Sequence, residues 1–220
     1  MPAQDARRIR LGLAALAVYG VLIAAMIVVR GPFVDAADSP GPFAEVAGSA
    51  RFLAYSLGTT VGVALGLYGF LALYAYLADG GPAVSGPAFW GLVLSIGLVF
   101  LMPILGVYAF AGPPVAALYR HDPRRGIELA AAMGNGWYLA MVLLQALFYC
   151  AGSLYFGIAI WRSGALPRWT GLFFILQGPM IQFVPLVSYA GEILGAVMLA
   201  VSCVWIAYAG SRRPAAAGTP

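Results

Sequence analysis

Residues 11–29 read LGLAALAVYGVLIAAMIVV, nineteen residues without one charged side chain. An α-helix needs about twenty apolar residues to cross roughly 30 Å of hydrocarbon, so this run predicts a transmembrane helix. Arg7, Arg8 and Arg10 precede the run, and Arg30 follows it directly. The run is longer than the roughly 7–15 residues of a signal-peptide core, so we expect a helix that is retained.

The rest of the chain repeats this pattern. The 220-residue sequence is 62% hydrophobic and only 9% charged, whereas soluble domains carry about 25% charged residues. Its mean hydropathy is +0.90. Further spans are predicted over 52–77, 89–111, 129–161, 170–187 and 189–209. We therefore expect an all-α fold: a polytopic transmembrane bundle of about six helices, one domain over 1–210, and a disordered tail over 211–220.

Glycine and proline mark the boundaries of several predicted spans. Gly112-Pro113-Pro114 should end the third span, because proline removes backbone donors. Gly134 and Gly136 predict a frayed or interfacial start for the long fourth span. The fifth and sixth spans are separated only by a turn near residues 185–188, so we expect a tight antiparallel hairpin.

Arginine placement predicts orientation. All twelve basic residues are arginine, and with abundant Ala, Gly and Pro this is typical of a GC-rich bacterium. With the N-terminus inside, seven arginines flank the inner ends of the spans and five flank the outer ends. The positive-inside rule then favours a multi-pass protein of a bacterial inner membrane with both termini in the cytoplasm. The arginines at 120–125 on the outer side oppose this assignment.

The sequence gives no support for metal binding, cysteine redox chemistry or nucleic-acid binding. The single histidine, His121, has no partner cluster with metal-ligand spacing, so we expect no metal and no cofactor. Cys150 and Cys203 lie in apolar segments and are interpreted as buried thiols. The net charge of +4 forms no basic stripe, which argues against a nucleic-acid partner and suits contact with membrane lipids.

Glu192 is the one candidate for catalysis. An ionisable group in a membrane helix is costly and usually faces the bundle interior or a wet cavity. Gly195 and Ala196 share its helix face, which favours an inward-facing carboxylate in a structural role. A proton-carrying acid and a carboxylate solvated at headgroup depth are the alternatives.

Polar amides and tyrosines form a second set of candidates. Gln145 shares a helix face with Tyr138 and Tyr149, while Gln177 and Gln182 flank Pro179 on the fifth span. Hydrogen bonds between helices are the favoured interpretation for these amides. The alternative is a polar-lined ligand pocket formed by Gln145, Tyr138, Tyr149, Gln177, Gln182 and Glu192.

Two sequence patterns concern packing. Gly58, Gly62 and Gly66 make a ridge of small residues that predicts close helix contact. The loop between the first two spans repeats itself, with Gly-Pro-Phe-Val-Asp at 31–35 and Gly-Pro-Phe-Ala-Glu at 41–45. Two short interfacial turns on the outer surface would follow. We favour coincidence in a Gly- and Pro-rich loop as the origin of the repeat, and a lid over a cavity is the alternative.

The segment Trp161-Arg162-Ser163 followed by Leu166-Pro167-Arg168-Trp169-Thr170-Gly171 carries a resemblance. It resembles the helix–turn–helix centre of multi-helix bacterial integral-membrane proteins known only as domains of unknown function. The resemblance covers about the last third of the chain. It implies a membrane fold of five to seven helices and transfers no active residues.

Three function classes remain. We favour a non-catalytic accessory subunit or a binder of an apolar ligand, with an apolar small molecule or another membrane protein as partner. An intramembrane enzyme acting on an isoprenoid or lipid, with Glu192 as acid, is one alternative. It is weakened because the apolar cores of the second to fifth spans contain no acid. A small transporter is the other alternative, although no convincing internal repeat is present.

Overall fold

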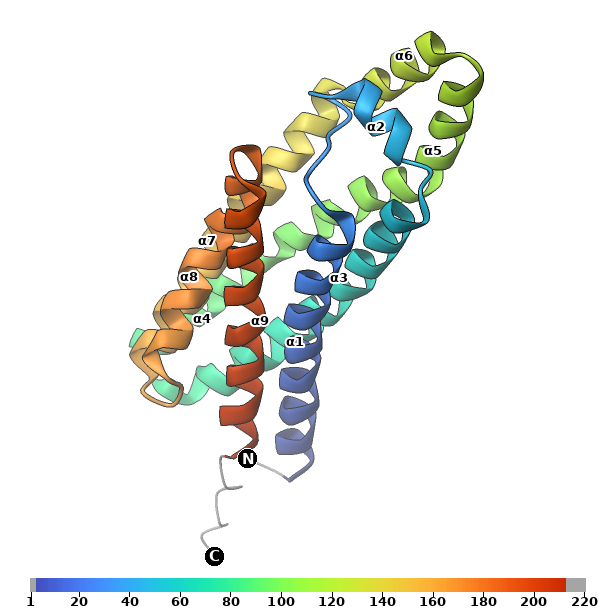
Figure 1. Cartoon of the computed structure of the whole chain (residues 1–220). Helices are drawn as coiled ribbons and strands as arrows, with labels where there is room; N and C mark the ends of the chain where they lie inside the picture. Colours follow the sequence, from blue (N-terminus) through green and yellow to red (C-terminus); the bar gives the residue numbers. More distant parts are fainter. Residues whose placement is uncertain (1–2, 213–220) are drawn as a thin grey trace, which may run out of the picture.

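The computed structural model describes residues 3–212, and every regular element in that range is helical (Figure 1). In chain order the elements are α1 (Ala3–Arg30), α2 (Pro40–Val46), α3 (Ala50–Leu77), η1 (Ala78–Gly80), α4 (Pro82–Ser95), η2 (Ile96–Phe100), α5 (Leu101–His121), α6 (Pro123–Met133), α7 (Gly136–Ser163), α8 (Arg168–Gln182), η3 (Val184–Leu186) and α9 (Tyr189–Ser211). Six stretches within the described range are long and apolar enough to cross a membrane; the third joins α4, η2 and α5. The fold is an all-α bundle of a multi-pass membrane protein.

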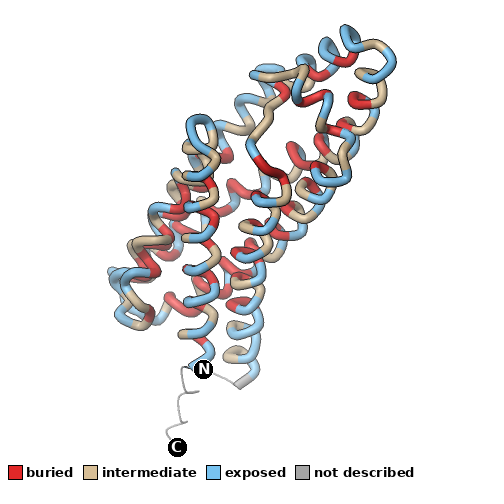
Figure 2. Tube along the Cα trace, viewed as in Figure 1, coloured by how far each residue is buried: buried red, intermediate tan, exposed pale blue. Residues whose placement is uncertain are grey.

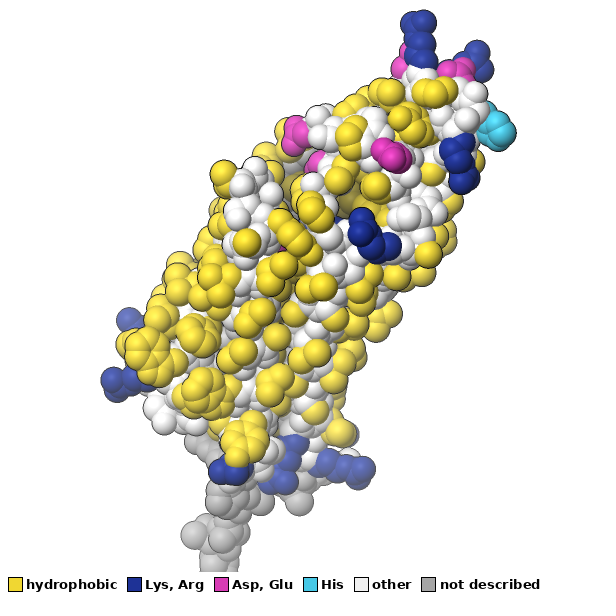
Figure 3. All heavy atoms as spheres, in the orientation of Figure 1, with side chains coloured by type: hydrophobic (Ala, Val, Ile, Leu, Met, Phe, Trp, Pro, Cys, Tyr) yellow, Lys and Arg dark blue, Asp and Glu magenta, His cyan; other side chains and the backbone are white. Residues whose placement is uncertain are grey.

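The outer surface is that of a protein surrounded by lipid. Hydrophobic side chains cover the middle of the face seen in Figure 3, arginines lie toward both of its ends, and acids are seen toward the upper end. Buried residues form stripes on the inner faces of the helices (Figure 2). The charged ends are separated by an apolar belt, as expected when each helix buries one face in the bundle and exposes the other to hydrocarbon.

The first helix lies at the centre of the packing. α1 packs along α3 on one side and along α9 on the other, while α7 packs against α4 and α8 (Figure 1). Gly210 near the end of α9 lies against Leu13 near the start of α1, so the described ends of the chain meet at one end of the bundle. Aromatic rings fill the core where these layers meet, with Phe70 stacked on Phe156 at 5.4 Å.

The predicted glycine ridge of the second span lies on α3 and faces α1. A Cβ at Gly62 would lie 2.9 Å from Ile23 Cδ1, and one at Gly66 would lie 2.8 Å from Tyr19 Cδ2. One turn later, a Cβ at Gly69 would lie 2.7 Å from Leu16 Cβ and 2.8 Å from its Cα. The two backbones therefore approach closely because α3 presents hydrogen atoms where other residues carry side chains.

We expected the third span to end at the paired prolines, and this prediction is wrong. α5 continues through Pro113 and Pro114 to His121. Two consecutive prolines remove only two backbone donors, and packing offsets that loss. A Cβ at Gly112 would lie 2.7 Å from the Ala47 carbonyl oxygen, and Val115 is buried. Contacts with the segment between α2 and α3 therefore keep this stretch helical.

The start of the fourth span also differs from the predicted 129–161. Residues 123–133 form the separate helix α6, and the span begins at Gly136. Asn135 caps the new helix, its Oδ1 accepting a hydrogen bond from the Tyr138 amide at 3.1 Å. The polar cap and Gly134 together interrupt the apolar pattern, so α6 and α7 are two helices rather than one.

The last two spans form the expected hairpin. α8 ends at Gln182, earlier than the predicted 187, and the single turn η3 connects it to α9. Of the tail predicted over 211–220, Ser211 is the last residue of α9, and 213–220 lie outside the described residues.

The close contact between α1 and α3 predicts a strong effect of one added methyl group. Gly69→Ala should cost about 1–3 kcal/mol, because the new Cβ meets the Leu16 backbone and the helices must separate. The matched control is Gly106→Ala on α5, where nothing lies within 4 Å of the added Cβ. Melting temperature in detergent measures both variants. Equal melting temperatures would mean that the α1–α3 contact is looser than described.

Candidate functional site

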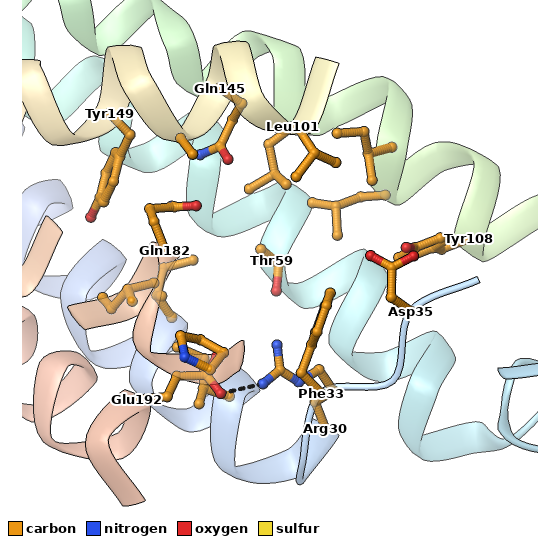
Figure 4. Close-up of a pocket in the computed structure, with 18 of the residues that line it drawn as sticks. Arg30, Phe33, Asp35, Thr59, Leu101, Tyr108, Gln145, Tyr149, Gln182 and Glu192 are labelled. Carbon is orange, nitrogen blue, oxygen red and sulfur yellow. Dashed lines mark hydrogen bonds and ion pairs between the residues drawn. The ribbon is translucent and has the colours of Figure 1, made fainter. Parts of the chain in front are cut away.

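A cavity of about 310 Å³ lies inside one half of the bundle, between α1, α3, α5, α7 and the turn joining α8 to α9 (Figure 4). It is bounded by the last third of α1, the first half of α3 and the start of α9, so it lies in the half away from the described chain ends. α4 packs tightly along α7, whereas α5, which follows η2, makes few contacts with α7. The cavity occupies the space between α5 and α7.

Most of the cavity wall is apolar. Aliphatic side chains come from five α-helices, η2 and η3, and tyrosine rings interrupt them. The aliphatic members include Ile23, Ile27, Val63, Leu98, Leu101, Ile104, Leu105, Val142 and Ile181. Such a wall favours an apolar occupant, and the few polar groups set its orientation.

Arg30 and Glu192 form a buried ion pair at one side of the cavity. Arg30 Nη2 donates to Glu192 Oε2 at 2.5 Å, and the two side chains are 6% and 2% exposed (Figure 4). Arg30 Nε also donates to the Gly31 carbonyl oxygen at 3.1 Å. The guanidinium lies 5.0 Å from the Phe33 ring and 5.2 Å from the Tyr55 ring. The pair therefore joins the end of α1 to the start of α9.

Asp35 ties the loop at 31–39 across one end of the cavity. Its Oδ2 accepts a hydrogen bond from the Tyr138 hydroxyl at 3.0 Å, and its Oδ1 accepts from the Ala37 amide at 2.8 Å. The Tyr138 hydroxyl also contacts the Tyr108 hydroxyl. Phe33, Asp35 and Asp38 line the cavity from this loop. The loop thus lies over the cavity, as the lid alternative proposed.

The opposite end is closed by a hydrogen-bonded network between α1, α7 and α8. The Tyr149 hydroxyl donates to Gln177 Oε1 at 2.8 Å and lies 3.3 Å from the Tyr19 hydroxyl. Gln177 Nε2 donates to Ser153 Oγ at 2.8 Å and to the Phe174 carbonyl at 3.2 Å. Gln177 is fully used by this network and lies behind the cavity wall.

Two polar atoms of the wall have no partner. Gln145 Nε2 and Thr59 Oγ1 make no hydrogen bond, although their side chains are 97% and 96% buried (exposed fractions 3% and 4%). Figure 4 shows Gln145 entering the cavity from α7 and Thr59 from α3. Leaving a buried donor unpaired costs about 1–3 kcal/mol. Among the described residues Thr170 Oγ1 is the one further case, and it does not line the cavity.

The sequence-predicted site residues divide as follows. Tyr138, Gln145, Tyr149, Gln182 and Glu192 line the cavity, and Gln177 does not. Sequence reasoning missed Arg30, Thr59 and Asp35. Arg30 directly follows an apolar run and was counted only among the arginines that flank the spans, and no local signal distinguishes such an arginine from one in a buried ion pair.

No group of three or more His, Cys, Asp or Glu side chains that could hold a metal ion occurs among residues 3–212. No family model, curated protein or solved structure matches the chain. The cavity is therefore the feature of the described chain that points to a function.

The ion pair predicts a specific pattern of mutational effects. Arg30→Met and Glu192→Gln should each lower the free energy of unfolding by about 3–5 kcal/mol, because each leaves one buried charge unpaired. The double variant should recover most of that loss. The melting temperatures in detergent of the unmodified protein, the two single variants and the double variant measure how strongly the two charges are coupled.

The control pair lies on α6. Arg124 and Glu128 are 3.2 Å apart on the exposed face, so Arg124→Met and Glu128→Gln should leave the melting temperature nearly unchanged. Additive losses at residues 30 and 192 would show that these two charges are not coupled.

Proposed function

We propose that this protein is a non-catalytic intramembrane binding protein whose cavity holds an apolar small molecule. The observation that carries the proposal is a cavity of about 310 Å³ with an aliphatic wall and two buried, unpaired polar atoms. Ligand pockets begin at roughly 300 Å³, and a bundle core between facing helices is a common place for them. A membrane protein with this cavity can bind a molecule that partitions into lipid, alone or as an accessory subunit of a larger assembly.

The arrangement around Glu192 argues against its use as a catalytic acid. A proton donor must release its proton to substrate, whereas the Glu192 carboxylate is bonded to the guanidinium of Arg30 at 2.5 Å. That ion pair accounts for the cost of placing a carboxylate in the bundle. A structural role for Glu192 supports the binding function over the enzyme.

We also propose that the described chain ends face the cytoplasm of a bacterial cell. Arginines at 7, 8, 10, 162, 168 and 212 lie at the end of the bundle where α1 starts and α9 ends. The exposed arginines at the other end are Arg51, Arg120, Arg124 and Arg125, and Arg30 there is buried. Because Arg30 is buried, it no longer counts among the arginines exposed at that end. The excess of arginines at the end that holds the chain termini is therefore larger, which supports this orientation.

Filling the cavity should abolish binding. Ala146 lines the cavity and is 4% exposed, so Ala146→Phe places a ring in the ligand space. We expect the affinity for aminoanthracene, a fluorophore that brightens in apolar sites, to fall about tenfold or more. Fluorescence titration of the purified protein in nanodiscs measures it.

The matched control is Ala140→Phe, on the exposed face of the same helix. It adds the same ring to the same lipid environment and should keep the affinity of the unmodified protein. Equal loss in both variants, or saturable binding in neither protein, would contradict a binding function for the cavity.

Orientation can be tested with Ala216→Cys in a background carrying Cys150→Ser and Cys203→Ala. A membrane-impermeant maleimide should label it only after the cells are opened. Ala132→Cys, at the end of α6, should be labelled from outside intact cells. The reverse pattern would place the chain ends outside.

A further inference from the structure

We infer that the ligand of this cavity is an uncharged apolar molecule carrying carbonyl acceptors, of the quinone type, with Gln145 Nε2 and Thr59 Oγ1 as its hydrogen-bond donors. This inference rests on the proposed binding function and names the class of ligand. The observation behind the inference is a pair of polar atoms, from two helices, that face one cavity and have no hydrogen-bond partner.

The unpaired atoms require acceptors on the ligand. An amide nitrogen only donates hydrogen bonds, and a threonine hydroxyl has one proton to donate. Gln145 Nε2 and Thr59 Oγ1 have no hydrogen-bond partner within the protein, so a ligand that supplies lone pairs can accept from both of them. A pure hydrocarbon leaves both donors unpaired, and an ammonium group offers no acceptor at all. Carbonyl oxygens satisfy both donors and add no charge to the cavity.

The charges around the cavity disfavour an anion. Arg30 is the one basic side chain of the wall within residues 3–212, and Glu192 already neutralises it. Asp35 and Asp38 add two carboxyl groups at the loop end. A carboxylate or phosphate ligand would meet net negative charge in a low-dielectric setting, where like charges repel strongly. The acceptor group of the ligand is therefore neutral.

The rest of the wall suits an attached apolar chain. Leu139 and Leu143 of α7, and Leu186 of η3, line the cavity and are also 51%, 56% and 70% exposed on the outer surface. They form an apolar edge between the cavity and the space occupied by lipid. A chain attached to the carbonyl-bearing ring can lie across this edge while the ring occupies the interior.

The test compares three probes that share a ten-carbon chain: decylbenzoquinone, decylbenzene and decanoate. Each competes with aminoanthracene for the purified protein in nanodiscs. We expect decylbenzoquinone to bind about tenfold more tightly than decylbenzene, because only the quinone pairs both donors. Decanoate should bind most weakly.

Two nearly isosteric variants locate the recognition. Gln145→Met and Thr59→Val should each reduce the quinone's advantage over decylbenzene severalfold and leave decylbenzene affinity unchanged. Both variants should melt at or above the temperature of the unmodified protein without ligand, because an unpaired buried donor has been removed. A structural role for either polar group predicts a lower melting temperature instead. The control is Thr60→Val, whose hydroxyl already donates to the Ser56 carbonyl at 2.8 Å and does not line the cavity.

The outcomes separate the two proposals. Equal affinity for decylbenzoquinone and decylbenzene would overturn the carbonyl inference and leave the binding function standing. Tighter binding of decanoate would overturn it as well. If both variants kept the full preference for the quinone, other groups would be recognising its carbonyl oxygens, and the assignment of Gln145 and Thr59 as donors would be wrong. Failure of every probe to displace aminoanthracene, with no saturable binding of aminoanthracene itself, would overturn the binding function.

Discussion

Arg30 and Glu192 place a positive and a negative charge in the buried interior of the bundle. Neither charge is stable there alone, because an unpaired ion in a low-dielectric interior costs several kcal/mol. The end of α1 and the start of α9 must therefore stay together once the chain is folded. This constraint positions the other parts of the site. Arg30 holds the Gly31 carbonyl and lies against Phe33, and these contacts orient the loop that crosses the cavity.

The cavity exists because packing is uneven along the bundle. Glycines let α3 approach α1 closely, and α4 lies tightly along α7. Beyond η2, α5 makes few contacts with α7, and the cavity occupies the space between them. Hydrogen bonds close both ends: Tyr138 with Asp35 on one side, and Tyr149 with Gln177 on the other. The space therefore has hydrogen-bonded groups at both ends and an aliphatic wall between them.

Local properties of the sequence were enough to predict the bundle, because a membrane span is defined by its own length and apolarity. Boundaries set by tertiary contacts were not. α5 passes through two prolines because Gly112 and Val115 pack against distant residues, and a window of sequence does not contain those residues.

The site shows the same division. Polar residues on apolar helices were identified as pocket candidates from their rarity, and five of the six line the cavity. Gln177 differs because Tyr149 and Ser153 on the neighbouring helix satisfy its amide. The partner of Glu192 could not be predicted, since 162 positions separate it from Arg30. A charge at the end of a span looks the same in the sequence whether it turns outward or inward.

The position of the cavity in one half of the bundle affects the route by which a ligand could reach it from the membrane. Its apolar edge at Leu139, Leu143 and Leu186 lies near the start of α7 and at the α8–α9 turn, so in a bilayer crossed by these helices it would face one leaflet. A ligand of the proposed kind that entered there would be drawn from that leaflet. Occupancy would then follow how the molecule is distributed between the two leaflets, rather than its total amount in the membrane. The protein would respond to an asymmetry that a cavity at the midplane cannot sense.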